Sequence, residues 1–425
     1  MVGNSGKRLL SRLIHPFFIS SALFCVFVYG GILKIKDRTP YGSLVPVFSL
    51  EEIIGTICSN PVKNQRGTYY SLNLSLENVT GQVGKASVTS SAHGVLRCLV
   101  PTNLVEALYP GRLYSQSGKK ILFENGEKVR LKGSFASGFF ICTDGFYCGH
   151  KKSVSGNLIH FRALCRLKFK KLMYGWKECG GFILSLLSGS REYTDSTVME
   201  SFRRAGLSHI LALSGMHLSF FSSLAGGTGK KILGKKFSFW LRLIGIIFFV
   251  WFAGLSPSLL RALICSLTML LCGVVFSLET DFFIVLCFSF IIHCVISPAD
   301  IFSTAFILSY GALAGILLLG DFFNSIFSRF LPKNISDSLS ASISAQSATA
   351  PVSIVMFGTV MPVGIIASVV VSPMVTFFLT AAVFSIAICL VMPFLSPLFG
   401  CIMKVLYMVI VTAVKTFAFF PPVKF

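Results

Sequence analysis

Long apolar runs separated by short polar breaks dominate the chain from residue 207 onward. Runs of about 20 apolar residues match a helix that crosses a hydrocarbon core about 30 Å thick. We predict transmembrane helices at 13–33, 207–225, 237–256, 259–278, 282–297, 301–320, 339–358, 363–392 and 398–418. The stretch 363–392 is long and contains Pro373, so a broken or tilted helix, or a re-entrant piece followed by a span, is expected there. The pattern predicts a polytopic α-helical membrane protein.

Residues 47–150 have a different pattern, in which short segments such as Thr68–Leu76 and Lys128–Phe135 alternate polar and apolar positions. Turns containing glycine separate these segments, which favours several short strands. A region of this size suits a small five-stranded β-barrel of the OB-like type. We therefore divide the chain into an N-terminal transmembrane helix (1–40), an OB-like β domain (45–150), a basic amphipathic helical linker (151–200) and a polytopic channel domain (201–425).

Composition supports a membrane protein, because 53% of residues are hydrophobic and only 13% are charged, whereas about 25% is usual in soluble proteins. The net charge of +21 suits an anionic partner, but basic cytoplasmic loops also produce such an excess.

Residues 226–236 contain four lysines and no acid, which predicts a cytoplasmic loop. With a basic, cytoplasmic N-terminus, two crossings precede that loop, and the β domain is expected outside the cytoplasm.

Residues 151–177 carry eight Lys or Arg and no acid, and their apolar positions recur at helical spacing. Two interpretations remain open for this basic helix. It could anchor to lipid headgroups, or its lysines, in particular Lys168, Lys170 and Lys171, could attract nucleic-acid phosphates at a pore mouth.

Polar residues inside the predicted spans are costly and usually face a cavity or one another. They gather in clusters whose candidate site residues are Ser208, His209, Ser214, Gly215, His217, Ser256, Pro257, Ser258, Arg261, Gln346 and Pro351. Ser256 and Pro257 predict a helix start, and Asp300 is expected to cap another helix. Ser214 and His217 could suggest a hydrolase, but no nearby carboxylate would orient the histidine. We therefore predict no enzymatic activity, and no cofactor or metal.

These clusters resemble the motifs of the ComEC family of competence proteins. The family pattern G-L-x-H-L-L-A-I-S-G-x-H is similar to residues 206–217, and S-P-S-x-x-R-A is present at 256–262. The pattern P-x-x-x-x-S-x-x-F-x-L-S matches from Pro298 to Ser309, and A-Q-x-A-T-x-P matches 345–351. Many members also carry a C-terminal metallo-β-lactamase-like domain, but its H-x-H-x-D-H motif does not occur in this sequence.

The resemblance implies a multi-pass channel in the bacterial cytoplasmic (inner) membrane that imports single-stranded DNA during natural transformation. It implies membrane lipids, a separate DNA-receptor protein and a cytoplasmic translocation ATPase as partners, and it is compatible with a homo-oligomer. A small-solute or ion transporter with an external β domain remains the alternative, because broken helices and buried histidines also suit transport.

Overall fold

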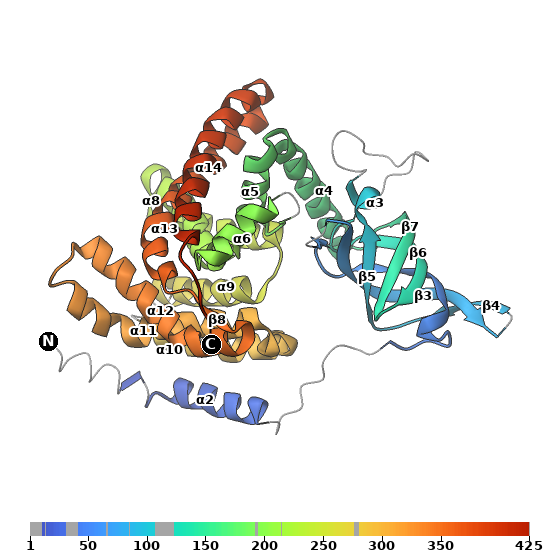
Figure 1. Cartoon of the computed structure of the whole chain (residues 1–425), viewed down its shortest axis with the longest axis horizontal. Helices are drawn as coiled ribbons and strands as arrows, with labels where there is room; N and C mark the ends of the chain where they lie inside the picture. Colours follow the sequence, from blue (N-terminus) through green and yellow to red (C-terminus); the bar gives the residue numbers. More distant parts are fainter. Residues whose placement is uncertain are drawn as a thin grey trace.

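The computed structural model describes residues 11–12, 14–30, 41–64, 67–84, 86–106, 123–191, 194–213, 215–275 and 280–424. It contains a β-sheet region and a larger helical region, joined through a long helix, α4 (Figure 1). Ser214, Tyr109–Arg112 and all of residues 31–40 lie outside the described residues.

The sheet region contains strands whose alternating burial follows the sequence pattern. Its strands are β1 (Leu50–Ile57), β2 (Val62–Lys63), β3 (Tyr69–Val83), β4 (Ala86–Ser91), β5 (Val95–Pro101), β6 (Lys128–Ala136) and β7 (Phe139–Gly149), with η1 (Val47–Ser49) and α3 (Thr102–Glu106) beside them. Strand β1 pairs with β6 and also with β3, so the order β1-β6-β7-β5-β3 returns to its first strand. The β5–β7 pairing is parallel and the other pairings are antiparallel.

The interior of this ring of strands is apolar. Ile53, Tyr70, Leu74, Leu131 and Phe140 are all fully buried there. Because successive side chains of a strand point to opposite faces, each of these strands also presents a second, more exposed set of side chains outward. The buried side chains of these strands thus form one packed apolar cluster.

The helical region begins with α2 (Pro16–Tyr29) and continues from α4 to the end of the chain. Its elements are α4 (Val154–Gly175), α5 (Lys177–Ser188), α6 (Ser196–Arg204), α7 (Ser208–Leu211), α8 (Gly215–Ala253), α9 (Pro257–Leu270), the π-helical turn η2 (Leu271–Val275), α10 (Phe282–Ile296), η3 (Pro298–Phe302), α11 (Thr304–Phe327), α12 (Lys333–Phe357), α13 (Val363–Val391), η4 (Pro393–Leu395) and α14 (Ser396–Ala418), with a short β8–β9 pair (Thr359–Val360 and Val423–Lys424). Helix α2 packs against α10, where Arg12 Nε donates to Asp281 Oδ2 at 2.8 Å.

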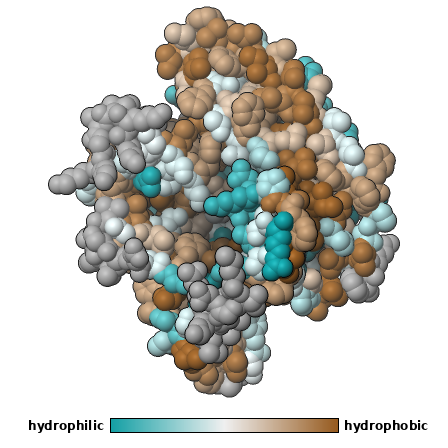
Figure 2. Space-filling view, turned by 90° about the vertical axis from the view of Figure 1, so that its left-hand side faces the viewer, coloured by the Kyte–Doolittle hydropathy of each residue, from teal (hydrophilic) through white to brown (hydrophobic). Residues whose placement is uncertain are grey.

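Three described helices are long and apolar enough to cross a membrane: Thr304–Phe327, Val363–Val391 and Pro393–Ala418. They correspond to the predicted spans at 301–320, 363–392 and 398–418. The predicted spans at 13–33, 237–256, 259–278 and 282–297 correspond to shorter apolar helices, and the serine-rich α12 is not among the candidates. The space-filling view shows a broad hydrophobic surface around a hydrophilic patch (Figure 2). The structure therefore supports membrane-spanning helices at three of the predicted spans.

One expectation about helix continuity is corrected and another is supported. Helix α13 runs unbroken through Pro373, so the broken-helix and re-entrant alternatives for 363–392 are wrong. Helix α8 is assigned as one element, yet the ring centroids of Phe221 and Phe249 are 4.5 Å apart. A straight helix would separate these positions by about 42 Å, so the two halves of α8 lie side by side as the predicted pair of apolar segments.

Candidate functional site

The segment 206–217 is not the single helix expected from its sequence. Helix α6 ends at Arg204, α7 covers only Ser208–Leu211, and α8 begins at Gly215. Between α7 and α8 the backbone is extended at Ala212, with φ −81° and ψ 136°. His209 and His217 therefore lie on two different helices, because the chain leaves the helical conformation between them.

Gly206 fixes one end of this broken segment. Its φ of +72° lies in the left-handed region, which glycine adopts without the clash that a side chain meets. A Cβ atom here would lie 2.9 Å from Gly364 Cα and 3.0 Å from Met361 Cβ. The broken segment thus packs backbone to backbone against the start of α13.

Arg261 lies near the other end of the segment. Ser256 caps α9, since its Oγ accepts from the backbone N–H of Leu259 at 3.3 Å, and Pro257 occupies the first turn. This confirms the predicted helix start and places Arg261 one turn into α9. A Cβ built on Gly215 would lie 3.4 Å from Arg261 Nη2, so these two motifs meet.

The Arg261 guanidinium contacts α11. Its Nη1 donates to the carbonyl oxygen of Ser309, and its Cζ lies 6.0 Å from the centroid of the Tyr310 ring. No carboxylate lies within ion-pair distance of Arg261 among the residues that the structure describes. Arg261 is thus a cation inside the helical region that is held by a carbonyl dipole and an aromatic face.

A chain of hydrogen-bonding groups continues from Tyr310. Its hydroxyl lies 3.1 Å from Ser289 Oγ and 3.3 Å from His293 Nδ1. His293 Nε2 in turn lies 3.2 Å from Asp300 Oδ2. The interpretation of Asp300 as a helix cap is wrong, because Ser303 caps α11. Tyr310, Ser289 and His293 were not selected from the sequence, although an imidazole in an apolar run is a signal that could have found them.

The polar residues of α12 divide between two faces. Ser336, Ser340 and Ser344 form a buried stripe, and a Cβ on Gly315 of α11 would lie 2.6 Å from the Ser344 carbonyl oxygen. These small residues let α11 and α12 pack closely, so the stripe lines a helix contact. Gln346 Nε2 instead donates to the Met361 carbonyl at 2.7 Å, which is beside Gly206.

The remaining candidates are less closely grouped. Ser208 and His209 are exposed on α7, and His217 is buried on α8. Ser258 is partly buried in the first turn of α9, and Pro351 lies inside α12 without ending it. The site that the structure assembles therefore consists of the broken segment, Arg261 with its α10–α11 network, and Gln346.

The basic residues of α4 have different environments. Lys168 is exposed and Lys171 is partly buried, so both can still attract an anion. Lys170 is 1% exposed, and its Nζ donates to Glu124 Oε1 at 2.6 Å. The prediction that Lys170 attracts DNA is wrong for this conformation, because its charge is already neutralised inside the protein.

A sequence model described as "Competence protein" matches residues 186–425, which is more than half of the chain. The chain belongs to the competence protein family. This confirms the resemblance found in the four motifs, all of which lie inside the matched region. The sheet region lies outside it.

Two curated relatives match parts of this competence protein. It is 26% identical to ComE operon protein 3 of Bacillus subtilis (strain 168) over 152 residues, which cover 34% of this chain and 19% of that protein. It is 31% identical to uncharacterized protein YcaI of Escherichia coli (strain K12) over 103 residues, which cover 22% of this chain and 13% of that protein. The matches span a fifth or less of either relative. No solved structure matches the chain.

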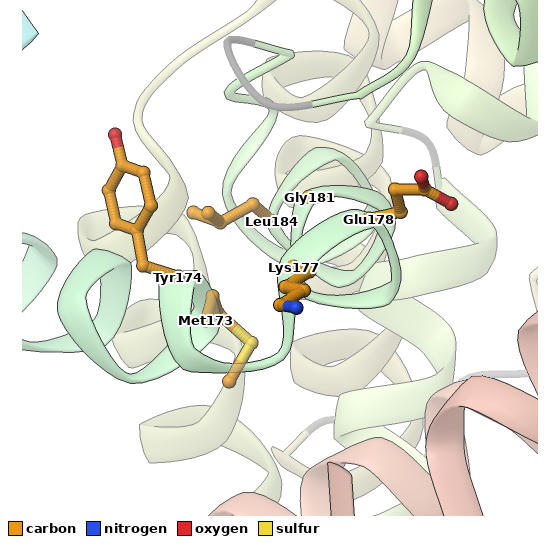
Figure 3. Close-up of a pocket in the computed structure, with 6 residues that line it drawn as sticks. All are labelled: Met173, Tyr174, Lys177, Glu178, Gly181 and Leu184. Atoms are coloured by element: carbon orange, nitrogen blue, oxygen red, sulfur yellow. The ribbon is translucent and has the colours of Figure 1, made fainter. Parts of the chain in front are cut away.

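A small pocket lies away from the competence motifs. It is at the corner between α4 and α5 and is lined by Met173, Tyr174, Lys177, Glu178, Gly181 and Leu184 (Figure 3). Its lining contains none of the motif residues, so we do not assign it to the site.

The substitution Gly206→Ala is expected to destabilise the helical region by about 2 kcal/mol or more. A left-handed backbone costs alanine about 1–2 kcal/mol, and its Cβ would also displace the Gly364 backbone. The matched control is Gly175→Ala, because no atom lies within 4 Å of a Cβ at Gly175. Thermal denaturation of the full chain in detergent measures both, and equal midpoints for the two variants would contradict the packing role of Gly206.

Proposed function

We propose that this competence protein is a multi-pass channel that admits single-stranded DNA across the bacterial cytoplasmic membrane during natural transformation. The family supports a link to DNA uptake, and the finer mechanism rests on Arg261. A guanidinium without a carboxylate partner is costly inside an apolar region, whereas it suits a phosphate that passes through. Gly215 and the Ser309 carbonyl beside Arg261 provide a polar environment for that step.

We also infer that the ring of strands is an OB-like barrel outside the cytoplasm. Five strands that return to the first, with one parallel pair, suit that architecture. On its outer side, Arg97 Nε donates to Ser71 Oγ at 3.0 Å, and the Arg97 Cζ lies 5.1 Å from the Phe139 ring centroid. A cation beside an aromatic ring is the combination with which such barrels bind single strands.

Passage requires that each contact with DNA be weak enough to release the strand. Arg97 and Phe139 would then receive the strand, Lys168 and Lys171 would guide it, and Arg261 would compensate phosphate charge inside. A separate DNA-receptor protein and a cytoplasmic translocation ATPase would deliver and pull the strand. These partners, and any homo-oligomer, remain part of the proposal.

The substitution Phe139→Ala is expected to weaken binding of an oligothymidine to the full chain by about 5- to 100-fold, since base stacking on one aromatic contributes about 1–3 kcal/mol. Phe48→Ala is the matched control, because Phe48 is 85% exposed and makes an edge-to-face contact with Phe135 of β6. Fluorescence anisotropy with a labelled oligonucleotide measures both variants. An equal loss in both, or no loss in either, would contradict binding at Arg97 and Phe139.

The channel itself is tested by uptake of labelled DNA. In a transformable bacterium whose own family member is deleted, expression of this chain should restore nuclease-resistant internal label. Membrane-inserted protein at normal levels with no internal label would contradict the proposal.

A further inference from the structure

Three side chains that can bind a metal meet where the sheet region joins α4. Glu127 precedes β6, His150 follows β7, and His160 lies in α4. One ligand atom from each lies within 4.8 Å of the other two. His160 Nδ1 is 2.8 Å from Glu127 Oε1, and the two imidazole rings stack with centroids 4.2 Å apart.

Glu127 is a buried carboxylate that has no lysine or arginine partner among the described residues. It is 0% exposed, and its side chain contacts the Tyr147 hydroxyl at 2.7 Å and His160. Glu124, three residues earlier, is equally buried but contacts both Arg166 and Lys170. Since a buried carboxylate is costly without a compensating positive charge, Glu127 requires a cation that Glu124 already has.

The two imidazole rings lie against this carboxylate. They are parallel within 11°, and each offers a ring nitrogen within 4.8 Å of a Glu127 carboxylate oxygen. The Tyr147 hydroxyl donates to Glu127 at 2.7 Å and adds no positive charge. A divalent metal ion would supply positive charge and bind both imidazoles in their neutral form.

We propose that Glu127, His150 and His160 bind one divalent transition-metal ion, with Zn²⁺ as the preferred ion. Imidazole and carboxylate ligands suit Zn²⁺, and water would complete a tetrahedral site with three protein ligands. Neighbouring side chains are placed to orient the ligands, as outer-shell groups do in zinc sites. Tyr147 donates to Glu127, and Asn157 Oδ1 lies 3.0 Å from His150 Nε2.

The ion would fasten the sheet region to α4. Gly126, beside Glu127, has a φ of +93°, and a Cβ there would lie 1.9 Å from Ile159 Cγ2. The Gly126 backbone thus packs against the Ile159 side chain of α4 next to the ligands. A bound ion would hold Glu127 and His150 against His160 and would stabilise this junction. The proposal does not depend on the protein's role in DNA uptake.

Metal binding is tested on the full chain in detergent after treatment with a chelator. Isothermal titration should show one equivalent of Zn²⁺, with Kd raised at least 100-fold by His160→Ala and about 10-fold by Tyr147→Phe. His93→Ala is the matched control, because His93 is an exposed histidine of the sheet region outside the cluster, and its Kd should equal that of the wild type.

Co²⁺ provides a readout that requires no variant, because tetrahedral Co²⁺ absorbs visible light far more strongly than hexaaqua Co²⁺. The wild-type chain should show the intense band, and added Zn²⁺ should remove it. Absence of the band, or Zn²⁺ affinity unchanged by His150→Ala and His160→Ala, would overturn the proposal.

Discussion

The substitution Glu124→Gln is expected to destabilise the protein by about 3–5 kcal/mol, which is the usual cost of breaking a buried ion pair from one side. Glu124 is 1% exposed and lies 3.1 Å from Arg166 Nε and 2.6 Å from Lys170 Nζ. Arg166 also donates to the carbonyls of Phe252 and Ala253 at the end of α8. Loss of the carboxylate therefore removes the negative charge that compensates these two buried cations between the sheet and helical regions.

Denaturation of the full chain in detergent measures this loss, and Glu77→Gln is its matched control. Glu77 pairs with Lys128 on the surface, with 44% of the Glu77 side chain exposed, and exposed pairs contribute less than about 1 kcal/mol. A Glu124→Gln variant as stable as Glu77→Gln would contradict the role of Glu124.

The same carboxylate predicts a pH dependence. Burial opposes its ionisation, but Lys170 and Arg166 more than offset this and lower the pKa of Glu124 from its ordinary 4.5 to about 2. A lowered pKa contributes stability that is fully present above about pH 4.5 and is lost as the pH falls towards 2. The Glu124→Gln variant should lack this part of the acid sensitivity. A dependence of stability on pH equal to that of the wild type would contradict this prediction.

The substitution Arg261→Gln is expected to reduce DNA uptake roughly 30-fold or more, with the protein still inserted in the membrane. Removal of a desolvated charged partner costs about 2–5 kcal/mol, and about 2 kcal/mol corresponds to a factor of roughly 30. The loss should be smaller for Arg261→Lys, because it keeps the charge but not the planar donor geometry. Internalised labelled DNA measures each variant.

Arg203→Gln is the matched control for Arg261→Gln. Arg203 has a side chain that is 62% exposed and pairs with Glu200 within α6, so uptake should be unaffected. Normal uptake in Arg261→Gln, at normal protein levels, would remove the main physical support for a phosphate-conducting path.

Local features of the fold were readable from the sequence because they depend on neighbouring residues. Alternating polarity indicated strands at 68–76 and 128–135, and these fall within or close to β3 and β6. Ser256 and Pro257 marked the start of α9 for the same reason, since capping involves residues within one turn. The apolar runs likewise located the helices that became α11, α13 and α14.

Structural features that depend on residues far apart in the sequence could not be predicted from it. The basic pattern around Lys170 indicated an exposed helix face. Its partner Glu124 lies much earlier in the chain, so the pairing could not be predicted from the sequence. The break between α6 and α7 coincides with the contact of Gly206 with Gly364, which local propensity does not encode. Arg261, Tyr310 and His293 form one network only after α9, α10 and α11 have packed together.

The most direct test of the conduit is a photo-crosslinking amino acid placed at Met216 in a strain that is importing labelled DNA. Met216 follows Gly215, which lies beside Arg261, whereas Ile402 is 47% exposed on the apolar helix α14 and serves as the control. We predict that illumination joins the incoming strand to position 216 and leaves position 402 unlabelled. Undiminished import with no strand joined at position 216 would contradict passage of DNA beside Arg261.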